Sequence, residues 1–146
     1  MLSLKKWQTA GGRINLGRVE EAERMLINRS CQVGGWNYGN PDVLGQELRS
    51  YVPTTAIALL AMQDRRTHPV IERSLDYLEQ NATSERSASA LALALLALEA
   101  CGRPTSGIRA ALIEQLPITM ELGNHMAIAL ATYALGSDKV NNAFTL

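Results

Sequence analysis

Three apolar stretches of the sequence decide the fold: Tyr51–Met62 (YVPTTAIALLAM), Ser87–Leu98 (SASALALALLAL) and Asn124–Leu135 (NHMAIALATYAL). Their ends lie 36 and 37 residues apart, and alignment on those ends superposes three sets of alanines. These sets are Ala56, Ala92 and Ala129; Ala58, Ala94 and Ala131; and Ala61, Ala97 and Ala134. A helix that is apolar on every side is buried on every side, and alanines let neighbouring helices approach closely. We therefore predict three inner helices.

A more polar, amphipathic stretch precedes each apolar one. The three are Arg18–Arg29 (RVEEAERMLINR), Val70–Gln80 (VIERSLDYLEQ) and Gly107–Leu116 (GIRAALIEQL). Their apolar residues recur at helical spacing, which predicts outer helices with one face toward water. Chain breakers separate the units, at Asn40–Pro41, Pro69, Gly102, Pro104, Gly107, Pro117, Gly123 and Gly136. We expect Gly102 just beyond a helix end and Ser106 as a helix N-cap.

This order predicts an all-α fold of α/α hairpin repeats with about three outer and inner helix pairs. The chain of 146 residues is expected to be a single domain, 1–146, with repeats at approximately 18–68, 69–105 and 106–138. An ordinary irregular helical bundle is the alternative, since alanine-rich helices align easily. Another open alternative is that residues 138–146 begin a further unit.

Composition and charge limit the partners. Apolar residues make up 47% of the chain and charged residues 19%, with 14 basic and 14 acidic side chains. The balance predicts no binding to nucleic acid, and no stretch is long and apolar enough to predict a membrane span. Without an apolar signal segment in residues 1–30, we expect a cytoplasmic protein whose Cys31 and Cys101 are free thiols.

The most specific feature is Ala22–Trp36 (AERMLINRSCQVGGW). It resembles the QW-type motif of the squalene cyclase and prenyltransferase superfamily, whose members are toroids of α/α hairpins. The spacing matches at Ala22, Leu26, Gly34, Gly35 and Trp36. Three positions depart: Met25 replaces an aromatic residue, Ser30 a glutamine and Val33 an acidic residue.

The resemblance implies that the turn is structural and that three hairpins form an arc of a toroid. Glycine permits a tight turn through positive φ, and the buried indole of a tryptophan needs a hydrogen-bond acceptor for its N–H. An array too short to close leaves apolar flanks, so we expect packing with a companion helical domain or another copy.

The catalytic groups of the family are not found. No two aspartates stand close enough for its acid motif, and no Asp-x-Cys pattern suggests zinc. His125 is expected to open the third inner helix, and His68 to be solvated in a loop. The sequence thus predicts no metal and no cofactor, and Cys31 is expected to pack near the turn.

One polar segment, Gly39–Tyr51, is a candidate binding loop at the mouth of the arc, with a simple solvated loop as the alternative. Its candidate residues are Asp42, Gln46, Glu47, Arg49 and Tyr51. The leading functional hypothesis is a non-catalytic helical-repeat module. The alternative is a terpene cyclase or prenyltransferase-like enzyme, or a fragment of one, that holds an isoprenoid as an apolar ligand between its inner helices.

Overall fold

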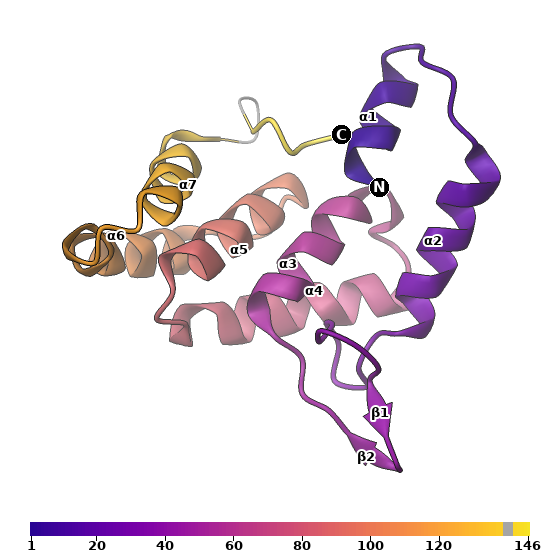
Figure 1. The fold of residues 1–146 in the computed structure, drawn as a ribbon, viewed down its shortest axis with the longest axis horizontal. Coiled ribbons are helices and arrows are strands. Elements are labelled where there is room, and N and C mark those ends of the chain that lie inside the picture. The colour runs from indigo at the N-terminus through magenta and orange to yellow at the C-terminus, as the bar shows by residue number, and fades with distance from the viewer. Residues whose placement is uncertain (139–141) are drawn as a thin grey trace.

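The computed structural model describes residues 1–138 and 142–146, and it confirms the all-α prediction (Figure 1). Helices account for nearly all the regular structure of this part of the chain. The α-helices are α1 (Leu2–Thr9), α2 (Leu16–Asn28), α3 (Val52–Ala61), α4 (Pro69–Asn81), α5 (Ala88–Ala100), α6 (Ser106–Glu121) and α7 (His125–Gly136). Short 3-10 turns, η1 (Gln63–Arg65) and η2 (Ala82–Ser84), follow α3 and α4.

The three apolar stretches form a row of neighbouring helices. Helix α5 packs between α3 and α7, while α4 contacts α3 and α5 from one side and α6 contacts α5 and α7 (Figure 1). Helices α3, α5 and α7 therefore correspond to the predicted inner helices, and α2, α4 and α6 to the predicted outer ones. The repeat boundaries and the toroid arrangement stay predictions.

Burial differs sharply along this row. In α5 every residue except Ser89 and Leu93 is buried, and this helix forms the centre of the core. Helix α3 is buried apart from one side, where Ile57 is 56% exposed. In α7 the buried residues are Ala127, Ala131 and Ala134. The prediction that all three stretches are buried on every side is wrong for one side of α3 and for α7, which packs against α5 and α6 on one face and, within the described residues, is exposed at several positions of the other.

Several helix boundaries also differ from the prediction. Gly102 has the expected positive φ of 72° after α5. Pro117 lies inside α6 and does not end it; it is exposed, so water can satisfy the carbonyl left unpaired by the missing N–H. The N-cap of α6 is Thr105, and Ser106 is its first helical residue. His68 is not a solvated loop residue: its Nδ1 accepts a hydrogen bond from the Val70 backbone N–H and caps α4.

Helix α1 was not predicted from the sequence, and a buried group of charges attaches it. The Lys5 ammonium lies 2.5 Å from a carboxylate oxygen of Glu23 on α2 and 2.6 Å from one of Asp64 in η1. The second oxygen of Glu23 accepts from the Arg65 guanidinium at 2.8 and 3.0 Å. Lys5 and Glu23 are both buried. This cluster joins the first two helices to the end of α3.

At the other end of the row, a second polar network joins α5, α6 and α7. Arg109 of α6 donates to Glu99 of α5 at 3.1 Å and to the carbonyls of Leu135 and Ser137 at 2.6 and 3.2 Å. The Ser137 hydroxyl donates to the other carboxylate oxygen of Glu99 at 2.8 Å. Glu99 is buried, so this network satisfies a carboxylate that would otherwise be costly in the core.

Residues 142–146 form a tail that crosses back over the ends of the inner helices toward α1 (Figure 1). The Asn142 amide donates to the Leu96 carbonyl at 3.0 Å. The buried Gln63 side chain donates to the Phe144 carbonyl and accepts from the Leu146 N–H. Lys6 of α1 donates to the Thr145 carbonyl at 2.9 Å. Residues 138 and 142–146 contain no helix, and the possibility that residues 138–146 begin a further unit stays open.

The predicted polar connection contains a small β-hairpin. Strands β1 (Asp42–Val43) and β2 (Gln46–Glu47) pair antiparallel, with Leu44 and Gly45 at positive φ in the turn.

In the ranges 1–138 and 142–146, none of the helices has the length and apolar character needed to cross a membrane.

Candidate functional site

The Gly-Gly-Trp turn lies between α2 and α3 and also contacts α4. Gly34 and Gly35 have φ of 95° and 79°, as the sequence predicts. A Cβ on Gly34 would lie 2.5 Å from the Arg73 carbonyl oxygen, and one on Gly35 would lie 2.6 Å from the Thr55 hydroxyl oxygen. Glycine is thus required twice over, by backbone conformation and by the close approach of neighbouring atoms.

Buried hydrogen bonds fix this turn to both neighbouring helices. The Gly35 N–H donates to the Ser74 hydroxyl of α4 at 2.8 Å, and the Trp36 N–H donates to the Thr55 hydroxyl of α3 at 3.0 Å. The Ser50 hydroxyl donates to the Gly34 carbonyl. The turn therefore joins the first hairpin to the second.

Trp36 closes the turn on the side of α2. Its side chain is buried, and the indole N–H donates to the Leu26 carbonyl at 2.7 Å. Leu26 packs against the core, and Ala22 lies one turn earlier on α2. Cys31 is fully buried beside the turn, where its backbone N–H donates to the Gly35 carbonyl. The structure thus brings all five residues of the predicted motif to one corner of the molecule.

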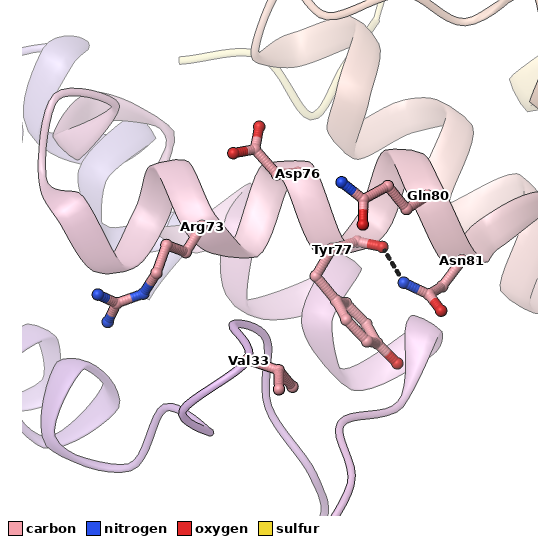
Figure 2. A pocket seen from close by; sticks show the side chains of 6 residues that line it. All are labelled: Val33, Arg73, Asp76, Tyr77, Gln80 and Asn81. Atoms are coloured by element: carbon pink, nitrogen blue, oxygen red, sulfur yellow. Dashed lines mark hydrogen bonds between the residues drawn. The ribbon is translucent and has the colours of Figure 1, made fainter.

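A polar cleft runs beside the turn along α4. Val33, Tyr77 and Asn81 line two adjoining hollows of about 480 and 340 Å³. Figure 2 shows the larger one, where five of the labelled residues come from α4 and the Tyr77 ring projects from α4 on the side where Val33 lies. The Tyr77 hydroxyl donates to the Ser50 carbonyl at 2.8 Å, and burial raises the pKa of this phenol, which keeps it a neutral donor.

The five predicted loop residues do not converge on one point. The Asp42 carboxylate accepts from the Gly45 N–H within the hairpin, and Glu47, paired with Asp42 across it, accepts from the Gln32 N–H. Gln46 pairs with Val43 and is exposed.

Arg49 and Tyr51 are the loop residues that line the smaller hollow of the polar cleft. The guanidinium of Arg49 lies 5.0 Å from the centre of the Tyr51 ring, within the range of a cation–π contact. The Tyr51 ring in turn lies 5.1 Å from that of Tyr38. Sequence reasoning did not find Tyr77 as a site residue, although it is one of the three residues that line both hollows.

An apolar groove of about 430 Å³ is lined by Trp36, and sequence reasoning did not find its position. Residues of α2 and α3 form its walls together with Met1 and the residues after the turn. Its apolar lining consists of Met1, Leu26, Trp36, Tyr38, Ile57, Ala58 and Ala61. Arg29 provides a positive charge at the same groove. The feature of the sequence that could have indicated this groove is Ile57, a bulky apolar residue on the exposed side of α3.

The buried titratable groups serve the structure. Burial raises the pKa of Glu23, but hydrogen bonds and charges from Lys5 and Arg65 outweigh it, so that the net pKa is lowered and the group stays ionised. Burial raises the pKa of the Cys101 thiol. Both cysteines are free and buried, as predicted. Among the described residues, no three His, Cys, Asp or Glu side chains are grouped so that they could hold a metal.

Comparison with known proteins adds no assignment: no family model, no curated protein and no solved structure matches this chain.

Proposed function

We propose that this chain is a non-catalytic α/α helical-repeat module that binds another protein through an apolar tip at the α6–α7 end. The tip consists of Ile113, Ile118, Met120, Leu122 and Met126, whose exposed fractions range from 51% to 78%. Four of these residues lie within nine positions, where α6 turns into α7. Exposed apolar side chains gathered at one end of a molecule are typical of an interaction site.

The non-catalytic part of the proposal is supported by the structural use of the charged groups. Glu23 and Glu99, the buried carboxylates, each accept from an arginine and join helices to one another. Asp76, on the polar cleft, lies 3.1 Å from Arg103. The Gly34–Trp36 corner, which joins neighbouring hairpins, supports the proposed likeness to an arc of the squalene cyclase and prenyltransferase toroid.

Binding through the tip can be tested with one substituted variant. Leu122→Gln with Met126→Gln removes apolar surface without disturbing the core, because both side chains are 78% exposed. The wild-type chain is expected to form a complex, with itself or with a protein captured from cell extract, that this variant does not form. A chain that stays monomeric and captures nothing in a tip-dependent way contradicts the proposal.

A second candidate function is binding of an isoprenoid in the apolar groove beside Trp36. The observation that favours it is the combination of an apolar lining with Arg29, which suits an apolar chain bearing an anionic group. Ile57→Glu places a charge in the groove at an exposed position, and Ile113→Glu, equally exposed on α6, is the matched control.

The two variants separate this candidate from non-specific binding. A prenyl diphosphate is expected to quench the fluorescence of the wild type and of Ile113→Glu but not of Ile57→Glu. Equal quenching in all three would rule the groove out. Turnover of squalene or a prenyl diphosphate that is lost on Asp42→Asn or Asp76→Asn would instead favour the enzyme hypothesis.

A further inference from the structure

The charges around the apolar tip have one sign. Between Ile113 and Met126 the sequence contains Glu114 and Glu121 and no lysine or arginine. Both carboxylates are exposed, and no ion pair involves either of them within the described residues. A partner surface that fits the tip must therefore offer positive charge beside an apolar depression.

Helix α2, at the opposite end of the row, offers such a surface. Residues 1–33 contain six basic and three acidic side chains; Lys5 and Glu23 are buried and paired with each other, which leaves five basic and two acidic ones. Arg18, Met25 and Arg29 follow one another at spacings of seven and four residues, so they share one side of the helix. Met25 is 50% exposed, and no ion pair of the described structure uses Arg18 or Arg29.

A shallow groove on α2 supplies the depression. It measures about 340 Å³ and is lined by Glu21, Arg24, Met25, Asn28 and Arg29. An aliphatic side chain from the tip can lie against Met25 while Arg24 and Arg29 face carboxylates from the tip. Glu21 is the acidic exception on this face.

The placement of the two surfaces decides that the contact is between molecules. Helices α6 and α7 lie at one end of the molecule and α2 at the other, with α3, α4 and α5 between them (Figure 1). A tip cannot reach its own α2. Two different surfaces that match across copies give a heterologous contact, which builds rings or open chains of subunits rather than a two-fold dimer.

We infer that the α6–α7 tip of one copy docks on the α2 groove of a second copy, head to tail. This inference rests on the proposed function, since it names the protein that the tip binds. Association is expected to weaken in high salt, because exposed charges contribute to it.

Charge reversal on each surface tests the inference in the full-length chain by sedimentation velocity. The tip variant carries Glu114→Arg and Glu121→Arg, and the groove variant carries Arg24→Glu and Arg29→Glu. All four side chains are exposed, so circular dichroism is expected to show unchanged folding. The apparent mass of the wild type is expected to rise with concentration. Each variant is expected to associate about tenfold more weakly than the wild type.

Mixing the two variants gives the decisive measurement. The wild-type tip of the groove variant fits the wild-type groove of the tip variant, and the two reversed surfaces also fit each other, so the mixture is expected to regain the association that each variant has lost. A chain carrying all four substitutions is expected to recover self-association, because both surfaces change sign together.

Three outcomes overturn the inference: a wild-type chain that stays monomeric from micromolar to millimolar concentration, variants that associate as well as the wild type, or a mixture that forms no complex. The proposed function fails separately. A monomeric chain that still captures a foreign protein through Leu122 and Met126 would contradict self-docking and leave the proposed function standing.

Discussion

Helices α5 and α7 begin from similar sequences and lie in different surroundings. Leu95 and Leu96 of α5 are fully buried, whereas the aligned positions of α7 are Thr132, which is exposed, and Tyr133, which is 37% exposed. Ala92 is fully buried, and its counterpart Ala129 is exposed. The central helix is buried on nearly all sides, whereas α7 buries one face, with Ala127, Ala131 and Ala134, and exposes the other.

The comparison teaches that helix composition alone does not decide burial. In α7 the two leucines of the central helix are replaced by residues that tolerate water, as expected of the last helix in a row. The Tyr133 hydroxyl also accepts a hydrogen bond from the Ala143 N–H at 2.6 Å, and its ring packs edge-on against Phe144. Part of the open side of α7 is therefore covered by the tail.

The largest expected effect on the free energy of unfolding distinguishes the central helix α5 from the end helix α7 at one pair of aligned positions. Leu95→Ala removes a fully buried side chain and is expected to lower the free energy of unfolding by about 3 kcal/mol. Thr132→Ala, at the matching exposed site of α7, is expected to change it by less than about 0.5 kcal/mol. Urea unfolding of both variants measures the difference, and similar losses would contradict the comparison.

The next largest effect on stability is expected at the Gly34–Trp36 turn, which joins the first hairpin to the helices that follow it. Gly34→Ala combines a strained backbone with a Cβ placed 2.5 Å from the Arg73 carbonyl oxygen, and it is expected to cost about 2–3 kcal/mol. Gly45→Ala is the control, because it has a similar φ of 77° and open space around it, and it is expected to cost about 1 kcal/mol. Equal losses in thermal unfolding would mean that the close approach to α4 contributes nothing.

How the end helix α7 is attached can be tested at Arg109. Arg109→Ala removes donors to Glu99 and to two carbonyls at the end of α7, and leaves the buried Glu99 carboxylate with Ser137 and Asn142. The expected cost is about 2 kcal/mol. Hydrogen exchange is expected to rise in α7 and not in α3; protection that is unchanged throughout would argue against this attachment.

The smallest expected effect is the pH dependence of stability that Glu23 contributes in the charge cluster at the N-terminal end. Because the pKa of Glu23 is lower when folded, its contribution is complete above its ordinary pKa of 4.5 and is lost as the pH falls through the folded value. The wild type is therefore expected to lose more stability between neutral and acidic pH than Glu23→Gln, in which this group does not titrate. Parallel pH profiles from chemical unfolding would show that the charge cluster does not stabilise the fold.

The sequence predicted the helices well because alanine, leucine and helical spacing are local signals. Ala90–Leu98 lies in the core as expected, and so does most of Thr55–Met62, in which Ile57 is exposed. The positive φ of Gly34 and Gly35, and the need of the Trp36 indole for an acceptor, also followed from residue chemistry.

What the sequence did not predict depends on contacts between distant residues. Helix α1 has few apolar residues in a regular pattern, and it is placed by Lys5 meeting Glu23 and Asp64, a pairing with no local signal. The exposure of α7 depends on which helices pack against it, and among the described residues these are mainly α5 and α6, which composition does not encode. Asp42, Gln46 and Glu47 were grouped by proximity in sequence, and the hairpin separates them from the cleft that Arg49 and Tyr51 line.

The tail has a mechanical consequence. Its bonds to Lys6 and Gln63 hold residues 142–146 against the first helix and the end of α3, so the two ends of the described chain are neighbours. A force applied between those ends loads this small set of polar contacts first and reaches the helix row only after they break. The molecule is therefore expected to yield in two stages, a weak release of the tail followed by the cooperative rupture of α3, α5 and α7.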